Sequence, residues 1–307
     1  MVMMMMQRRC AAVFPLLGVA RRSFATQHRS VQIPAADGVP LHALVPETTN
    51  GGGADKSKHA VPVLCLPSSF GSVTENFRLQ YEALGDKYTF IGVDPRGYGK
   101  SRPPERDFPG NYFERDAEDV VHMLDALGYD KVSILGWSAG ANVGAVFAAK
   151  YPERVSRLVL VNGNAFVADE DIEAYEKYED VSKWQPAARA EGEAIYGAEN
   201  LQKGWSEMLQ KLRSVYDDDG DLYCGLLPRI KCKTLVVAGA KDKLVQDFHG
   251  EYLSERIMHS RLHLFSNGRH DLHISEAREF NELLDTFLQE PDDKLTQSRE
   301  FVARPMP

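Results

Sequence analysis

The residues with the clearest chemical potential lie in the sequence Gly136-Trp137-Ser138-Ala139-Gly140. This is the pattern G-x-S-x-G, in which two glycines let a strand and a helix pass closely while the serine hydroxyl projects from the turn between them. A β-branched run at residues 132–135 precedes the pattern, and an alanine-rich run ending at Lys150 follows it. The order strand, tight turn, helix predicts a nucleophile elbow, with Ser138 as the nucleophile.

A serine nucleophile needs a general base to take its proton, and the base needs a carboxylate to orient it. In folds with such an elbow the order along the chain is serine, acid, histidine. Asp242 follows one late strand pattern and His270 follows the next, so we predict Asp242 as the acid and His270 as the base. Asp247 is the alternative acid. His263 lies inside a strand pattern and His273 at the start of a helix, which favours His270 over both.

Acyl transfer also needs two backbone N–H donors for the developing oxyanion. The Ala139 N–H, directly after the nucleophile, is the first candidate, and the loop after the strand at residues 61–66 supplies the second. In that loop we assign the Ser69 N–H, with Phe70 as the alternative. Ser68 stands where glycine is usual, which predicts a tighter loop. Three apolar residues are assigned to the substrate pocket: Phe70, Trp137 and Leu244.

Apolar runs of strand length alternate with helical patterns along most of the chain. Strand patterns fall at residues 31–34, 39–45, 61–66, 88–93, 132–135, 155–161, 234–239 and 261–265, and clear helical faces at residues 116–127 and 277–288. Runs that are apolar throughout are typical of strands buried on both faces of a parallel sheet. The alternation predicts a mostly parallel, doubly wound α/β sheet with right-handed crossovers.

The alternation stops between the strand pattern at residues 155–161 and the one at residues 234–239. The intervening sequence is rich in Glu, Lys, Tyr and Trp, and its periodicity is helical. It stands where a lid would cover the carboxyl ends of the strands. We therefore predict a helical cap at residues 164–230, inserted into a core of residues 25–163 and 231–289, with a disordered tail at residues 290–307.

Residues 1–24 differ in composition from the rest of the chain. They contain four arginines and no acidic residue, and residues 11–20 are an apolar run. A secretory signal peptide is the alternative, but Pro15 breaks the run and Arg21-Arg22 stands where the cleavage site should lie. The run is too short for a membrane span, which needs ~20 residues. We predict a mitochondrial transit peptide at residues 1–24, and a location in the mitochondrial matrix.

Composition limits the partners and cofactors. The formal net charge is −8, and loss of residues 1–24 would make it −12, which argues against nucleic acid and anionic membranes as partners. The four cysteines form no C-x-x-C pair, and we expect no metal and no cofactor. His122 and His249 are interpreted as helix-surface residues. The expected partner is a small-molecule ester, and the expected state is a monomer without a membrane span.

Several longer motifs resemble one known family. They are Asp94-Pro-Arg-Gly-Tyr-Gly, Phe113-Glu-Arg-Asp-Ala, Leu135-Gly-Trp-Ser138, Asp180-Val-Ser-Lys-Trp184, Leu226-Leu-Pro-Arg and Ser260-Arg-Leu-His-Leu264. Together they resemble the biphenyl hydrolase-like type of α/β-hydrolase, the mitochondrial valacyclovir hydrolases, over nearly the whole chain after residue 24. The resemblance implies a serine hydrolase of small esters, active on α-amino acid esters, whose triad falls on Ser138, Asp242 and His270.

Two positions depart from this family. Its members carry an acidic residue directly after the nucleophile, where this chain has Ala139, and glycine in the oxyanion loop, where this chain has Ser68. The first departure removes the group that would pair with the substrate ammonium, unless an acid such as Asp171 reaches in from the cap. Ser138 excludes epoxide and haloalkane hydrolysis, which use a carboxylate nucleophile. A hydrolase of C–C bonds and an inactive binding protein remain the alternatives.

Overall fold

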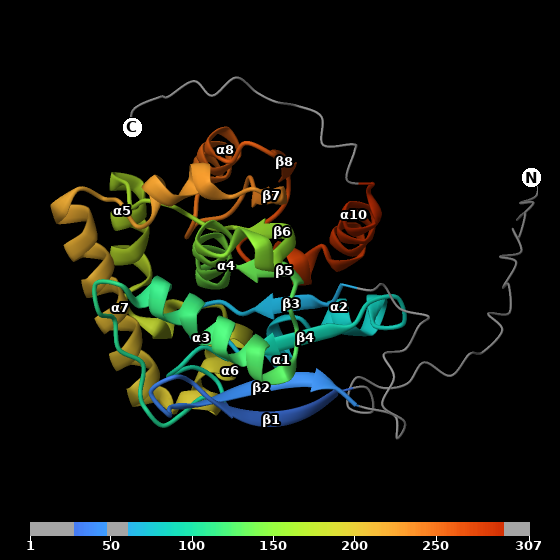
Figure 1. Ribbon diagram of the computed structural model, residues 1–307. Helices are drawn as coiled ribbons and strands as arrows, with labels where there is room; N and C mark the ends of the chain where they lie inside the picture. The colour runs from blue at the N-terminus through green and yellow to red at the C-terminus, as the bar shows by residue number, and fades with distance from the viewer. Residues whose placement is uncertain (1–27, 48–60, 292–307) are drawn as a thin grey trace, which may run out of the picture.

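The computed structural model describes residues 28–47 and 61–291, and its centre is one eight-stranded sheet (Figure 1). The strands lie in the order β1-β2-β4-β3-β5-β6-β7-β8. They are β1 (His28–Pro34), β2 (Pro40–Pro46), β3 (Val63–Leu66), β4 (Phe90–Val93), β5 (Val132–Trp137), β6 (Val155–Val161), β7 (Lys233–Gly239) and β8 (Ser260–Phe265). The strands from β3 to β8 are parallel to one another, and β2 is antiparallel to both of its neighbours, β1 and β4. The predicted mostly parallel α/β sheet is confirmed.

Helices cover both faces of the sheet. They are α1 (Val73–Asn76), α2 (Arg78–Leu84), α3 (Tyr112–Leu127), α4 (Ala139–Lys150), α8 (Asp247–Arg256), α9 (Leu272–Ser275) and α10 (Ala277–Gln289). Alternate strand residues serve the two faces: Leu64 joins the apolar core under α3, α4 and α8, whereas Cys65 joins the core under α2 and α10. Because both faces are covered, the inner strands are apolar throughout, and the sequence shows them as unbroken runs.

The cap follows β6 and precedes β7. Its helices are α5 (Asp169–Tyr178), α6 (Pro186–Tyr196) and α7 (Ala198–Asp218), with short 3₁₀ helices η3 (Val181–Lys183) and η4 (Cys224–Arg229). Figure 1 shows α5, α6 and α7 on the side of the molecule toward which the arrows of β3 and β5 point. Tyr175, Leu201 and Trp205 form an apolar core that also takes in Phe70 and Tyr98 from the loops after β3 and β4. The cap is therefore packed onto the loops that surround the strand ends.

Two sequence predictions fall on the chain ends. The transit peptide at residues 1–24 lies outside the described residues and stays a prediction. The tail predicted at residues 290–307 also lies outside them, apart from Glu290 and Pro291. These two residues are held in place: the Glu290 carboxylate pairs with Arg261 at 2.5 Å, and Lys233 donates to the Pro291 carbonyl at 2.8 Å.

Candidate active site

Ser138 occupies the turn between β5 and α4, as the elbow pattern predicts. Its backbone has φ 55° and ψ −122°, a region that non-glycine residues rarely adopt, and its N–H donates to the Val161 carbonyl at 2.8 Å. Both glycines of the pattern are required by close contact. A Cβ on Gly140 would lie 2.1 Å from the Leu66 carbonyl oxygen, and one on Gly136 would lie 2.4 Å from the Gly140 oxygen. Ser138 itself is partly exposed, so a substrate can reach it.

The close approach at Gly140 predicts a stability cost for any side chain there. We expect Gly140→Ala to lower the free energy of unfolding by about 1–3 kcal/mol, because the methyl group must displace the backbone of β3. Gly225→Ala is the matched control, since a Cβ there meets nothing within 4 Å. Urea denaturation of both variants checks this. Equal unfolding free energies would show that the elbow has room for a methyl group.

Asp242 and His270 are brought together from the ends of β7 and β8. His270 Nδ1 lies 2.7 Å from Asp242 Oδ2, and the side chain of Asp242 is 0% exposed while that of His270 is 21% exposed. The other Asp242 oxygen, Oδ1, accepts from the backbone N–H groups of Leu244 and Val245 at 2.8 and 3.1 Å. Nδ1–H therefore donates to the carboxylate, and Nε2 is left as the proton acceptor that a general base needs.

The environment of His270 favours its charged form. Burial lowers the pKa of His270, but the negative charge of Asp242 and its hydrogen bond outweigh burial, so the pKa is raised above its ordinary value. A base with a raised pKa takes the serine proton more readily, as long as the pH keeps it neutral in the resting enzyme. This is the electrostatic arrangement expected of the base in an acyl-transfer site.

The residues considered as alternatives to His270 and Asp242 do not form a histidine–carboxylate pair with each other in the described part of the chain. His273 is fully buried, and its Nε2–H donates to the Asn76 carbonyl at 3.0 Å. Burial lowers the pKa of His273 to about 3, so it stays neutral, and its fully buried ring is out of reach of a substrate. His263 lies on the edge strand β8, with its ring 4.9 Å from that of Phe265. Asp247 begins α8 rather than facing a histidine. The geometry thus favours the pair Asp242 and His270.

The loop that carries His270 is held by two residues that the sequence did not reveal as positioning residues. Trp137 Nε1 donates to the His270 carbonyl at 2.7 Å. Asn162 Nδ2 donates to the carbonyls of Arg269 and His270 at 3.0 and 2.9 Å, and its Oδ1 accepts from the Gly239 N–H at 3.0 Å. Asn162 directly follows β6 and has φ 47°. An asparagine before a glycine at a strand end was the available signal, because asparagine tolerates this conformation.

The predicted nucleophile and base are not joined by a hydrogen bond in the described part of the chain. The hydrogen bonds within residues 28–47 and 61–291 include none from Ser138 Oγ to His270. Such bonds are often long without substrate and shorten in the reactive complex.

The non-glycine residues with positive φ in the described chain, Phe70, Ser138 and Asn162, all follow strands that end at this site. Strained backbone is typically retained at functional sites.

The Trp137 bond predicts an effect on rate. Trp137→Phe keeps an aromatic ring and removes the bond to the His270 carbonyl, so kcat should fall about 2- to 12-fold, which corresponds to one hydrogen bond of about 0.5–1.5 kcal/mol. Trp184→Phe is the control, because Trp184 Nε1 donates to the Tyr178 carbonyl at 3.2 Å inside the cap. Ester-hydrolysis kinetics would contradict the positioning role if both variants lost the same activity.

The oxyanion loop follows β3, as predicted. The Ser68 N–H donates to Asn76 Oδ1 at 3.2 Å, so it is already occupied. The N–H groups of Ala139, Ser69 and Phe70 have no acceptor within the described part of the chain. They stay the predicted oxyanion donors. Ser68 therefore fits the tight loop expected from the sequence, because its N–H anchors the loop to α1.

The chain is similar in sequence to known hydrolases over most of its length. A family profile described as alpha/beta hydrolase fold matches residues 61–191. Serine hydrolase BPHL of Homo sapiens is 41% identical over 269 residues, covering 87% of this chain and 89% of that protein. The chain belongs to the α/β-hydrolase family. The resemblance expected from the longer motifs is confirmed, and the family assignment supports hydrolase activity.

Other hydrolases are similar at lower sequence identity. Putative carbamate hydrolase RutD of Caulobacter sp. (strain K31) is 27% identical, with 81% of this chain and 96% of that protein covered. A solved structure of a hydrolase from Pseudomonas aeruginosa PA01 is 27% identical, with a TM-score of 0.65 over 85% of this chain and 98% of its own. The meta-cleavage product hydrolase of Pseudomonas fluorescens IP01, at 24% identity and a TM-score of 0.67 over 84% of this chain and 97% of its own, shares the fold.

The predicted pocket residues of this hydrolase have different surroundings. The Phe70 ring lies inside the cap core, 5.2 Å from Tyr98 and 5.5 Å from Tyr196 between ring centroids. Trp137 is buried against His270 and His273 rather than facing an open space. Leu244, two residues after Asp242, is partly exposed. Phe70 belongs to the apolar core of the cap, whereas Trp137 belongs to the core under α2 and α10. Their role in the substrate pocket stays a prediction.

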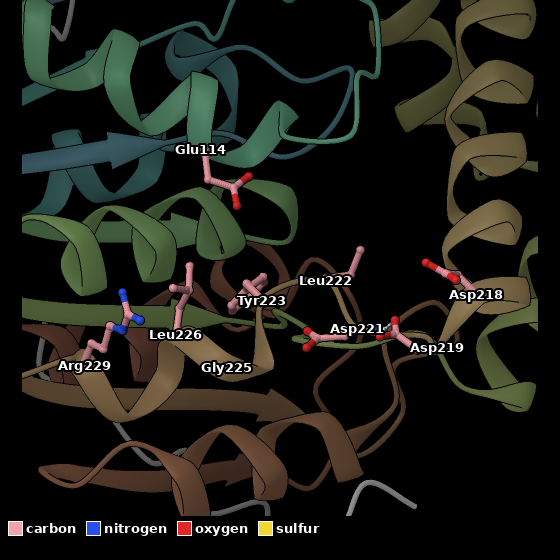
Figure 2. Close-up of a pocket in the computed structure, with 9 residues that line it drawn as sticks. All are labelled: Glu114, Asp218, Asp219, Asp221, Leu222, Tyr223, Gly225, Leu226 and Arg229. Carbon is pink, nitrogen blue, oxygen red and sulfur yellow. Dashed lines mark hydrogen bonds between the residues drawn. The ribbon is translucent and has the colours of Figure 1, made fainter.

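An open pocket of about 500 Å³ lies elsewhere, between the start of α3, the end of α7 and η4 (Figure 2). Figure 2 shows Glu114 projecting from α3 on one side and Asp218 lying at the end of α7 on another. The lining residues are Glu114, Asp218, Asp219, Asp221, Leu222, Tyr223, Gly225, Leu226 and Arg229. None of the three predicted pocket residues is among them, so this pocket is distinct from the one that the sequence predicted.

Asp171 does not serve as a replacement for the missing acidic residue at position 139. Both of its carboxylate oxygens contact His249 Nε2, at 3.0 and 2.9 Å, and both side chains are 0% exposed. His249 was interpreted as a helix-surface residue, and this is wrong: it lies on the inner face of α8. The sequence did not show this because α8 buries His249, Gly250 and Ser254, which give no apolar periodicity. The pair joins the cap to the core.

Within residues 28–47 and 61–291, no helix is both long enough and apolar enough to cross a bilayer. The same residues contain no group of three or more His, Cys, Asp or Glu side chains placed to hold a metal ion.

Proposed function

We propose that this hydrolase cleaves small carboxylic esters through an acyl-enzyme on Ser138. The observation that carries the proposal is the Asp242–His270 pair, in which the buried carboxylate holds Nδ1 and leaves the lone pair on Nε2, together with Ser138 in the strained turn of the elbow. Ser138 Oγ attacks the ester carbonyl while its proton passes to His270 Nε2, and Asp242 stabilises the imidazolium. The backbone N–H groups of Ala139 and Ser69 donate hydrogen bonds to the oxyanion.

The second half of the reaction uses the same groups. The ester C–O bond breaks as His270 returns its proton to the leaving alcohol. Water, deprotonated by His270, then attacks the acyl-enzyme and releases the carboxylic acid and the free serine. No step needs a group beyond these side chains, the two backbone donors and water.

Acid quenching during turnover tests this mechanism. We expect the full chain to hydrolyse p-nitrophenyl esters with many turnovers, and peptide mass spectrometry of quenched samples to find the acyl group on the peptide with Ser138. Turnover of esters without an acyl group on that peptide would overturn the acyl-enzyme, and absence of ester turnover would overturn the proposed reaction.

The substrate class follows from the residue beside the nucleophile. An acidic residue at position 139 would form a charge-assisted pair with an ammonium on the substrate α-carbon, worth about 1.5–3 kcal/mol. Here that residue is Ala139, and Asp171 is committed to His249. We therefore propose that the enzyme accepts small esters with little preference for an α-amino group.

Restoring the carboxylate should restore the preference. We expect Ala139→Asp to raise the ratio of kcat/KM for a phenylalanine ester over the matching 3-phenylpropionate ester by roughly 10- to 100-fold, at about 1.4 kcal/mol per tenfold. The two esters control for each other, because a general loss of rate leaves the ratio unchanged. A wild-type enzyme that already favours the amino ester strongly, with no change on Ala139→Asp, would place the ammonium site elsewhere.

A further inference from the structure

A second string of serine, histidine and aspartate lies at the edge of the sheet, away from the elbow. Ser30 belongs to β1, the edge strand at the bottom of Figure 1, and His42 belongs to its neighbour β2. Asp94 directly follows β4. Ser30 Oγ lies 2.9 Å from His42 Nε2, and His42 Nδ1 lies 2.8 Å from Asp94 Oδ2. The proposed triad at the elbow has the same order of residue types, serine, histidine and aspartate.

The His42–Asp94 pair is buried and held by several hydrogen bonds. The side chains of His42 and Asp94 are each 1% exposed. Asp94 Oδ1 accepts from the Val73 N–H at 2.7 Å, and Oδ2 accepts from the Lys100 N–H at 2.9 Å as well as from His42. The carboxylate is therefore fixed by backbone donors on two loops, and it fixes the imidazole in turn.

With a neutral His42 ring, the contacts fit one arrangement of protons. Because a carboxylate can only accept, Nδ1–H of His42 donates to Asp94, and the neutral ring keeps its lone pair on Nε2. The Ser30 hydroxyl then donates to Nε2, which is the contact that activates a serine for attack. Ser30 is exposed, so an electrophile can reach it without opening the fold. Here the serine–histidine bond is already formed, unlike that between Ser138 and His270.

We propose that Ser30 is a covalent modification site for activated acyl donors, such as aryl esters and thioesters. A bond forms from Ser30 Oγ to the acyl carbon, and the bond from that carbon to the leaving phenol or thiol breaks. The serine proton passes to His42 Nε2 and then to the leaving group. Ser30 lies within a regular antiparallel pair rather than at the start of a helix, so its adduct lacks the donors of an elbow. The result is a lasting stoichiometric adduct rather than turnover.

The test uses the full chain with Ser138→Ala, which removes the elbow nucleophile, and p-nitrophenyl acetate as the probe. Peptide mass spectrometry follows acetylation at Ser30 and at Ser182, an exposed serine whose hydroxyl contacts Asp180 but no histidine. We expect Ser30 to react at least about tenfold faster than Ser182, a threshold set below the roughly 10²- to 10⁴-fold by which a positioned base accelerates such a step. Equal rates at the two serines in the folded protein would overturn the proposal and leave the string a purely structural contact.

Two variants test whether Ser30 reacts because His42 accepts its proton or only because Ser30 is exposed. His42→Gln in the same background can still donate to Asp94 and accept from Ser30, but it cannot take a proton, so the rate at Ser30 should fall to that at Ser182. An unchanged rate in a folded His42→Gln protein would also overturn the proposal. Ser30→Ala in the otherwise wild-type chain should remove this adduct and leave ester turnover at Ser138 unchanged. If His42→Gln fails to fold, the comparison of Ser30 with Ser182 decides alone.

Discussion

Ser138→Ala and His270→Ala should each lower kcat for a p-nitrophenyl ester by about 10³-fold or more, and the double variant should be no slower than the slower single variant. The reason is that the two groups act in one proton transfer. Without the base the serine hydroxyl is a weak nucleophile, and without the serine the base has nothing to activate. Steady-state kinetics on folded protein measures all three variants.

The control for this prediction is another histidine on the same strand–loop unit. His263→Ala should keep nearly full activity, because His263 lies on β8 and packs against Phe265 rather than facing Asp242. The assignment of the base would be wrong if His270→Ala retained the wild-type rate. Additive losses in the double variant would show that Ser138 and His270 work in separate steps.

Asp242→Asn should lower kcat by about 10²- to 10⁴-fold, because it places the wrong tautomer at the base. The N–H groups of Leu244 and Val245 already point at one Asp242 oxygen, so the asparagine carbonyl would take that place. Its amide nitrogen would then face His270 Nδ1 and force the proton onto Nε2, where a general base needs a lone pair. Asp247→Asn, at the start of α8, is the matched control and should change kcat little.

The same substitution has a pH signature in the kinetics. Burial opposes the charge on His270, but Asp242 outweighs it and raises the pKa of His270. In the wild type kcat/KM should rise with pH through a pKa above the ordinary 6.5, as the base loses its proton. In Asp242→Asn the residual activity should rise with pH through a lower pKa than in the wild type, because the negative charge that raises the pKa of His270 is gone. Identical pH profiles would contradict the pairing.

The contribution of the Asp242–His270 pair to the free energy of unfolding should fall as the pH rises, whereas kcat/KM should rise. A raised pKa means that folded His270 binds its proton more tightly than the unfolded chain does, so the pair stabilises the protonated fold. This contribution is complete below the unfolded pKa of about 6.5 and is lost as the pH rises through the folded pKa. The difference in unfolding free energy between wild type and Asp242→Asn should therefore shrink as the pH rises. Urea denaturation at several pH values measures it, and a constant difference would contradict the linkage.

Much of this protein could be predicted from local sequence, because the features concerned depend on neighbours in the chain. The elbow around Ser138 needs glycines two positions away on each side, and this spacing is visible in the sequence. Strands buried on both faces appear as unbroken apolar runs. Asp242 and His270 could be proposed because in this fold each follows a strand, and parallel strands end at one edge of the sheet.

The tertiary structure decided what depends on residues far apart in the chain. Local sequence marks Asn162 only as an asparagine before a glycine, and it does not identify the His270 loop as its partner. It also gives no sign that His249 pairs with Asp171 or that Trp137 packs inward. Ser30, His42 and Asp94 come from two strands and a loop that only the sheet order β1-β2-β4 brings together. Periodicity reports which face of an element is apolar, whereas a buried polar contact depends on the partner that packing places opposite it.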